Sequence, residues 1–461
     1  MRFLKKIKFS LKKGFDRIRN EEIKRNVLQA IPFWIASVIT GIIAVIYSRL
    51  FLMAEEFAKM IFHFNSLLLF ILTPACFLFS WWLVRHFAPY AKGSGIPQVM
   101  ASIDLSSPKT SSIIDKLLGF RILIVKIASS LVMAAGGAAI GREGPTIQIA
   151  ASVFRVVNER LPLWIPKIAK KNVIITGAAA GLAAAFNTPL GGIVFAIEEL
   201  TKTHFSFYKT AIFSSVIIAG LTAQGLMGSY LYLGYPKVND LSVWIIAPVI
   251  LVAVFAGISG SIMSKLILGI LVWKSKLKFT SHHVLFIILC ALFIAFTAHF
   301  FNAEIMGSGK DTMERVLFTN DKHSAWYTPL LRITGPLISF TTGGAGGIFA
   351  PALGAGASIG SFISGWFNLS DTSTNLVILA GMVGFLTGVT RSPFTSAILV
   401  LEMTDRHSVI FYLILAGMIA SLVSIIIDKH SLYDHLKHQY IKELNEEEED
   451  TSKANSIQTK P

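Results

Sequence analysis

One acidic residue lies inside an otherwise apolar part of the chain. Glu143 belongs to the motif Gly-Arg-Glu-Gly-Pro (residues 141–145), between the segments LVMAAGGAAI and TIQIAASVF. A carboxylate at bilayer depth costs at least about 2.5 kcal/mol, so acids in such positions usually line an ion or proton path. The neighbouring glycines indicate irregular backbone, which survives at that depth only where it lines a cavity. The motif predicts a transport pathway at Glu143; a structural ion pair with Arg142 is the alternative.

Three short motifs share one design, in which glycines precede a proline and an apolar helical run. They are GSGIPQ (93–98), GREGP (141–145) and GGIFAP (346–351). Glycine permits a tight turn and proline suits the first turn of a helix. The N-terminus of a helix offers unpaired N–H donors and a partial positive charge, which together bind an anion. One such start is equally well explained as a packing glycine, but three predict convergence on a single anion site.

Two adjacent carboxylates, Glu198 and Glu199, end the helical run GGIVFAIEEL. A carboxylate at the C-terminus of a helix gains nothing from the helix dipole. From the residues alone, a solvated helix end and a functional acid pair both remain open.

The elements that position these motifs are predicted to be membrane helices. The 461-residue chain is 53% hydrophobic and only 15% charged, whereas soluble domains have about 25% charged residues. Many of its apolar stretches are broken by Gly or Pro, which predicts tilted and re-entrant helices in an all-α polytopic membrane protein. These stretches are Ile31–Leu50, Leu67–Val84, Leu117–Ala139, Val173–Ile197, Ala211–Leu226, Val243–Val272, Val284–Phe300, Leu376–Leu401 and Val409–Ile427.

The net charge of +15 is concentrated in a few segments. Basic residues cluster at the N-terminus and in loops such as 166–171 and 274–278, the positive-inside pattern, which favours a cytoplasmic N-terminus over nucleic-acid binding. Residues 1–27 are predicted to form a basic amphipathic helix on the inner membrane face. Residues 445–461 are acidic and polar, and are predicted to form a disordered cytoplasmic tail.

The chain contains an internal repeat. GAAAGLAAAFNTPLGGIVFAIEEL, from residue 177, aligns with GMVGFLTGVTRSPFTSAILVLEMT, from residue 381, and Glu198 then matches Glu402. GREGP falls level with GIFAP, and GSGIPQ has a weaker partner in GSGKDT (307–312). Duplicated halves of transporters commonly pack with inverted topology around a substrate site near the midplane. The predicted repeats are 28–235 and 236–428, followed by a C-terminal helix at 429–444; Glu402 is interpreted as structural.

GSGIP, GREGP and GGIFAP in this order resemble the CLC chloride channel and transporter family, in particular its bacterial chloride/proton antiporters. The resemblance covers about residues 30–440. It implies the CLC fold of two inverted repeats. It also implies a homodimer with one pathway per subunit, in the inner membrane with both termini cytoplasmic.

The resemblance also implies chloride ligands. They are the Ser94 hydroxyl, the backbone amides of Ile348 and Phe349, and the hydroxyl of Tyr433 in SLYDHL. On the residues alone, Tyr433 would be an interfacial aromatic. Ser94 favours chloride, since nitrate exchangers of the family carry proline there. The surrounding anion-site backbone is contributed by Gly95, Arg142, Gly144 and Gly347.

By the same resemblance, Glu143 is the gate and external proton acceptor, and Glu199 is the internal proton acceptor. Glu198 is the neighbour that helps water to reach Glu199. An ionised Glu143 is itself an anion and competes with chloride for helix N-termini. Having both Glu143 and Glu199 favours chloride/proton exchange over a passive channel.

Other functions remain as alternatives. A gated chloride channel of the same family is the first, a transporter of another anion the second, and an organic-solute transporter the third. A membrane-embedded enzyme is disfavoured, because no acid, base and nucleophile set is present. No cofactor or metal is expected: His282 and His283 lack a spaced partner, and GSGKDT departs from a phosphate loop.

Overall fold

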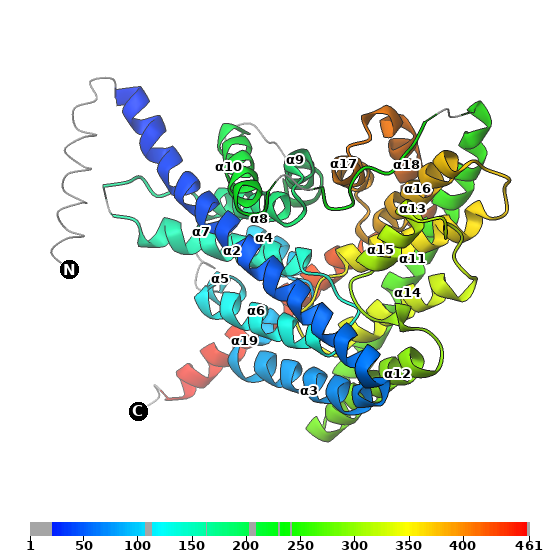
Figure 1. Ribbon diagram of the computed structural model, residues 1–461. Helices are drawn as coiled ribbons and strands as arrows, with labels where there is room; N and C mark the ends of the chain where they lie inside the picture. Colours follow the sequence, from blue (N-terminus) through cyan, green and yellow to red (C-terminus); the bar gives the residue numbers. More distant parts are fainter. Residues whose placement is uncertain are drawn as a thin grey trace.

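The computed structural model describes residues 21–106, 113–162, 164–201, 209–228, 231–239 and 242–458. These residues form helices joined by short connections (Figure 1), so the predicted all-α architecture is confirmed. Of the predicted amphipathic segment, residues 1–20 lie outside the described residues. Residues 21–27 are not a separate element; they begin the first long helix, α2.

The first half of the chain contains α2 (Glu21–Asn65), α3 (Leu69–Phe87), α4 (Ile96–Asp104), α5 (Ile114–Leu117), α6 (Phe120–Ala135), α7 (Glu143–Arg160), α8 (Lys170–Phe186), α9 (Pro189–Phe195) and α10 (Lys209–Met227). The second half contains α11 (Ile246–Ser275), α12 (Thr280–Phe300), α13 (Lys310–Phe318), α14 (Tyr327–Thr341), α15 (Phe349–Ser364), α16 (Asp371–Thr390), α17 (Pro393–Thr404), α18 (Ile410–Ile427) and α19 (Leu432–Gln458). A π-helical turn, Ala196–Thr201, follows α9.

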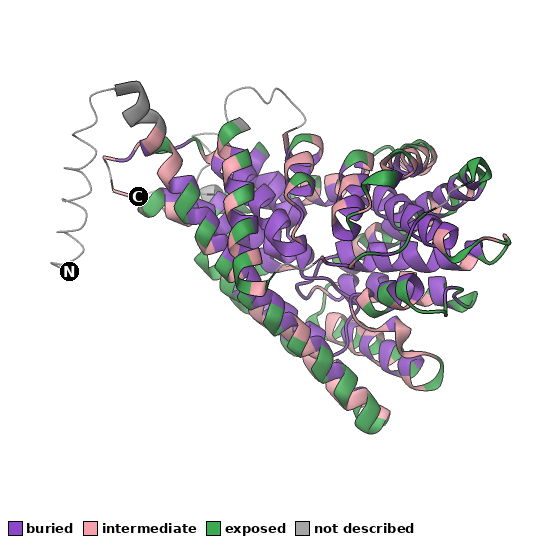
Figure 2. Cartoon of the chain, turned by 45° about the horizontal axis from the view of Figure 1, so that its top comes forward, coloured by how far each residue is buried: buried purple, intermediate pink, exposed green. Residues whose placement is uncertain are grey.

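The outer helices have the surface of a membrane protein. Within the described residues, seven helical stretches are long and apolar enough to cross a bilayer. On α2, exposed large apolar side chains such as Trp34, Ile46 and Met53 alternate with buried ones (Figure 2). By contrast, α16 is buried along almost its whole length, packed between α11 and α15. The chain therefore forms a multi-pass membrane protein whose inner helices lie away from lipid.

Helix breaks recur at matching places in the two halves. Asn187, with φ of 57°, ends α8, and Arg391, with φ of 63°, ends α16. A proline begins the next helix in both cases, at Pro189 and Pro393. The stretches Val173–Ile197 and Leu376–Leu401 are therefore each two helices rather than one, because a left-handed residue cannot continue an α-helix.

The prediction of a disordered tail was wrong for its described part. The last helix, α19, continues past Leu444 to Gln458. Its acidic face has partners on the first half of the chain: Glu443 pairs with Lys92 at 3.1 Å and Glu447 with Lys116 at 2.7 Å. The carboxylates stabilise a helix by these long-range pairs, which a composition argument does not see. Residues 459–461 lie outside the described residues.

Candidate anion site

Three helices begin at one place in the interior of the protein. They are α4, α7 and α15, whose N-caps are Gly95, Arg142 and Ile348. The loops before them are joined by backbone hydrogen bonds: Gly93 N donates to Gly344 O at 2.9 Å, and Gly346 N donates to Gly93 O at 3.0 Å. The three glycine motifs therefore form one connected structure, and three sets of helix N-terminal N–H groups point to the same region.

The equivalent glycines of the two repeats bond to each other. Gly141 N donates to Gly347 O at 2.8 Å, and Gly347 N donates to Gly141 O at 2.7 Å. This antiparallel exchange is the local geometry that a two-fold relation between GREGP and GIFAP requires.

Glycine is required where these loops meet. A Cβ at Gly144 would overlap Ser94 Oγ, and a Cβ at Gly347 would lie 3.0 Å from Gly144 N. Gly95 has φ of 104°, a left-handed conformation that side chains rarely adopt. The close approach brings the Ser94 hydroxyl against the first turn of α7.

Several polar atoms at this point have no protein partner. Among the described residues, the Ser94 hydroxyl, the Tyr433 hydroxyl and Oε2 of Glu143 are buried and form no hydrogen bond. Ser94 and Glu143 are each 1% exposed, and Tyr433 is fully buried. An unsatisfied buried polar group costs about 1–3 kcal/mol. The arrangement suits an anion, which accepts from hydroxyl and amide donors without a cation.

Phe349 and Tyr433 form one wall of the site. Their rings stack with centroids 6.1 Å apart and planes 7° apart. Phe349 lies in the first turn of α15 and Tyr433 in the first turn of α19. The Tyr433 hydroxyl lies beside the Ser94 side chain. The carboxylates of Glu199 and Glu143 are close enough to act on it through their charge. The structure thus brings Ser94, Glu143, Phe349 and Tyr433 together at one place.

Glu143 is held by a residue that sequence reasoning missed. Tyr232, in the segment between α10 and α11, donates its hydroxyl to Glu143 Oε1 at 3.3 Å. Its ring packs edge-on against Phe186 at 5.0 Å. The Arg142 guanidinium is more distant from the carboxylate, with Nε 4.0 Å from Oε1. No motif or spacing marks Tyr232, so only the fold reveals it.

We expect Tyr232→Phe to release Glu143 more easily. Losing this hydrogen bond removes about 1 kcal/mol of stabilisation from the carboxylate in the position that the structure shows. Because the bond favours the ionised form, the pH profile of chloride flux should move toward higher pH. Tyr235→Phe is the matched control, since Tyr235 lies in the same segment but is 61% exposed. An unchanged profile in Tyr232→Phe would exclude this contact as a restraint on Glu143.

Glu199 lies in the π-helical turn after α9, apart from Glu143. It is 4% exposed, and the Ser392 hydroxyl donates to its Oε2 at 2.5 Å. A narrow cavity touches Glu199, Phe349 and Tyr433 and is lined further by Phe195, Leu386, Thr390, Ser392, Thr395 and Ser396. Glu199 therefore borders the same small internal space as the site wall formed by Phe349 and Tyr433.

Glu198 points elsewhere, and its repeat partner shows why. Glu198 accepts from the backbone N of Phe394 at 3.2 Å and of Thr395 at 2.6 Å, the first turn of α17. Reciprocally, Glu402 accepts from the backbone N of Leu190 at 3.0 Å and of Gly191 at 2.6 Å, the first turn of α9. Each half therefore caps a helix of the other half, and each carboxylate lies at a favourable helix N-terminus.

Together, the fold and this site define a polytopic membrane protein in which three helix N-termini of the described residues meet at a buried polar position that suits an anion. Residues 75–425 match the profile of the family described as voltage gated chloride channel, and the chain belongs to that family. Members of this family are transport proteins and not enzymes.

Relatives and solved structures agree with this assignment. The chain is 29% identical over 385 residues to the H(+)/Cl(−) exchange transporter ClcA of Cronobacter sakazakii, a match covering 80% of this chain and 78% of that one. The fold matches the crystal structure of a slow cyanobacterial Cl−/H+ antiporter with a TM-score of 0.78, at 22% identity, covering 91% of this chain and 99% of that one. It also matches a CLC-type fluoride/proton antiporter with a TM-score of 0.73, at 20% identity, covering 89% and 98%.

Proposed function

We propose that this protein is a secondary active transporter that exchanges chloride for protons across the membrane. The observation that carries the proposal is the Glu143 carboxylate, buried at the meeting point of three helix N-termini beside the unpartnered hydroxyls of Ser94 and Tyr433. The name of the Cronobacter relative supports the same activity.

In this proposal, chloride and the ionised Glu143 carboxylate compete for one position. Chloride accepts from the hydroxyls of Ser94 and Tyr433 and from the backbone amides of Ile348 and Phe349. When Glu143 takes a proton, it loses its attraction to the helix N-termini and swings away. Chloride then enters, and the proton moves with the carboxyl. Movement of one ion thereby requires movement of the other.

The glycine backbone and Arg142 shape this position without supplying a ligand side chain. Gly95, Gly144 and Gly347 allow the three loops to approach, and Arg142 is anchored through Nη1 to Ser48 O at 3.1 Å. This hydrogen bond keeps the guanidinium beside Glu143 but does not bring it into a close ion pair, which would prevent the Glu143 side chain from moving.

Glu199 is the internal proton acceptor in this proposal. It is buried and borders the cavity that extends to Tyr433. Glu198 supports it by holding the first turn of α17, since Thr395 and Ser396 line the same cavity. In this proposal, Glu198 thereby helps water to reach Glu199.

The protein is further proposed to act in the inner membrane as a homodimer with one pathway per subunit. Both termini are assigned to the cytoplasm from the distribution of basic residues.

One experiment tests the exchange itself. Purified protein is placed in liposomes with a chloride gradient and no proton gradient, and internal pH and chloride are followed together. An exchanger uses the movement of chloride down its gradient to build a proton gradient where none existed. A channel moves chloride without uphill proton movement, and that result would overturn the proposal.

The Ser94 hydroxyl is expected to set anion preference. Ser94→Pro removes a donor to chloride, so nitrate should gain on chloride by about tenfold, the equivalent of one lost hydrogen bond to a charged group. The measurement is the chloride/nitrate flux ratio in liposomes. Ser94→Ala serves as the control for the backbone effect of proline and should weaken chloride preference in the same direction. An unchanged anion series in both variants would remove Ser94 as a ligand.

A further inference from the structure

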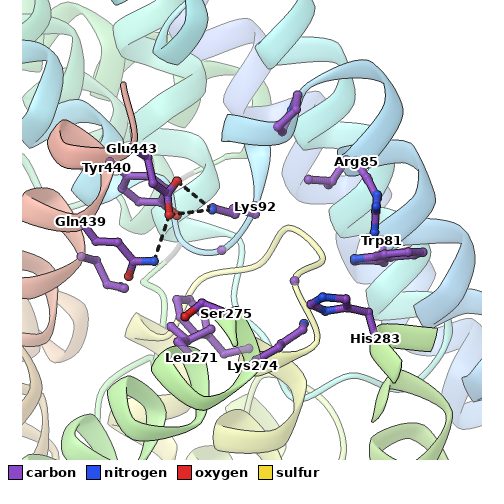
Figure 3. Close-up of a pocket in the computed structure, with 16 residues that line it drawn as sticks. Trp81, Arg85, Lys92, Leu271, Lys274, Ser275, His283, Gln439, Tyr440 and Glu443 are labelled. Carbon is purple, nitrogen blue, oxygen red and sulfur yellow. Dashed lines mark hydrogen bonds and ion pairs between the residues drawn. The ribbon is translucent and has the colours of Figure 1, made fainter. Parts of the chain in front are cut away.

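A second cavity lies on the side of the protein that carries α19. It has a volume of about 340 Å³ and is bordered by α3, α11, α12 and α19 and by the loops at Lys92–Gly93 and Gly343. Figure 3 shows Arg85, Lys92, Lys274 and His283 arranged around this space, with Glu443 beside Lys92. None of these side chains belongs to the proposed exchange site.

The cavity has more positive groups and donors than the protein satisfies. Three basic side chains, Arg85, Lys92 and Lys274, face one carboxylate, Glu443, which is already paired with Lys92 at 3.1 Å. The Lys274 ammonium has three donors, and two are used by Thr341 O at 2.8 Å and Thr342 O at 2.6 Å.

Arg85 has even more hydrogen-bond donors left without an acceptor among the described residues. Within the described part of the chain, its guanidinium makes one side-chain hydrogen bond, to Thr280 Oγ1 at 3.2 Å, and stacks 5.0 Å from the centroid of Trp81. A guanidinium has five donors in a fork that matches phosphate oxygens. The remaining donors and the net positive charge select an anion with several oxygens.

The opening of the cavity carries the residue types expected at a membrane–water interface. Arg85 and Ser275 are exposed at its rim, and the loop after α11 adds exposed Lys276 and Lys278. Large exposed aromatic side chains flank the opening on α3 and near the α11–α12 loop: Trp82, Phe87, Trp273 and Phe279. Aromatic residues beside basic ones mark the membrane–water interface. Basic pockets between membrane helices on the cytoplasmic side suit anionic headgroups.

We propose that this cavity binds the phosphate-bearing headgroup of an anionic phospholipid from the inner leaflet. The phosphate accepts from Arg85 and from the remaining donor of Lys274. The acyl chains lie against the exposed aromatic side chains of α3, the end of α11 and the α11–α12 loop.

A headgroup held here contacts three segments that carry anion-site residues. Lys92 and Gly93 directly precede Ser94, Gly343 opens the loop that leads to Ile348, and Tyr440 lies on the same helix as Tyr433. The Lys92 ammonium also lies 5.1 Å from the ring centroid of Tyr440. The bound lipid therefore stabilises the positions of these three segments relative to one another. This effect is separate from that of the surrounding bilayer.

The test compares lipid retention on the whole protein. Purified protein in detergent is mixed with phosphatidylglycerol or phosphatidylcholine, and bound lipid is counted by native mass spectrometry, with thermal unfolding as a second readout. Phosphatidylglycerol should be retained preferentially and should raise the unfolding midpoint. Arg85→Gln should reduce its retention about fivefold, the contribution expected of one basic residue.

Two further variants keep the test decisive. Lys442→Gln removes the same charge from α19 at a side chain that is 78% exposed and does not line the cavity, and should retain lipid as the native protein does. Ser275→Glu adds a carboxylate at the exposed rim and should lower retention even if Arg85→Gln is poorly folded. Equal loss in all variants, or no preference for phosphatidylglycerol, would overturn the proposal.

Free inorganic phosphate could bind to the same basic side chains as a lipid phosphate. Inorganic phosphate added without lipid should give no stabilisation at millimolar concentration, because it lacks the acyl chains. Stabilisation by phosphate that equals that of the lipid, and that is lost in Arg85→Gln, would overturn the lipid assignment. Because lipid binding is read directly, this result is independent of whether the protein exchanges protons.

Discussion

Glu143→Ala is expected to abolish proton coupling while chloride continues to move. The substitution removes the group that both takes the proton and occupies the anion position, so the two movements no longer depend on each other. Uphill proton movement driven by chloride should fall by about 10²-fold or more, as expected for loss of a proton-transferring side chain. Chloride flux should remain of the same order and should lose its dependence on pH. Internal pH and chloride recorded together in liposomes give both quantities.

A second acid on the same helix provides the control. Glu159 lies near the end of α7, is 40% exposed and pairs with Arg155 at 3.0 Å. Glu159→Ala should keep full coupling, whereas Glu143→Gln should reproduce the loss. Coupling that survives in Glu143→Ala would exclude Glu143 as the exchanging carboxyl, although it would leave the family assignment intact.

The convergence of the helix starts could be predicted because its causes are local. Glycine and proline at the start of α4, α7 and α15 fix backbone geometry within a few residues, and their types are visible in the sequence. The internal repeat then indicated that two of these starts are equivalent. The structure adds the direct pairing of Gly141 with Gly347, which no single motif contains.

Contacts between distant segments could not be predicted in the same way. Tyr232 reaches Glu143 across 89 positions of the chain, and nothing near either residue specifies this hydrogen bond. The capping role of Glu198 was also missed, because a carboxylate at the end of one helix gives no sign of the helix start that lies beside it. The matching position of Glu402 was the available clue, since reciprocal partners are expected of a two-fold repeat.

The acidic tail shows how composition misleads. A run of glutamates read alone predicts solvation and disorder, since like charges repel. Lys116 turns one of those glutamates, Glu447, into a contact of α19, and Lys92 pairs with Glu443 just before the run. The apolar stretches gave only the expectation of interruptions, and the left-handed backbone of Asn187 and Arg391 shows where two of them fall.

Glu199→Gln is expected to remove proton coupling from the opposite side of the site. The amide keeps the shape of the side chain and can still accept from Ser392, whose hydroxyl now lies 2.5 Å from Oε2. It cannot take up a proton, so protons from the internal side no longer reach Glu143. Uphill proton movement should fall by about 10²-fold. Chloride flux should continue and should still respond to external pH, because Glu143 remains a protonatable gate.

Glu402→Gln separates this effect from the loss of a carboxylate at the repeat interface. Glu402 is half-buried and accepts backbone N–H groups at the start of α9, but it does not border the cavity that joins Glu199 to Tyr433. Its amide variant should lower stability by about 0.5–2 kcal/mol, the range for a weakened helix cap, and should keep proton coupling. If Glu199→Gln retains coupling while losing stability as Glu402→Gln does, the second acid is a structural group and protons reach Glu143 by another route. If coupling is lost in Glu199→Gln but kept in Glu402→Gln, the loss comes from proton transfer by Glu199. It cannot come from the mere removal of a carboxylate between the two halves, because Glu402→Gln removes one as well.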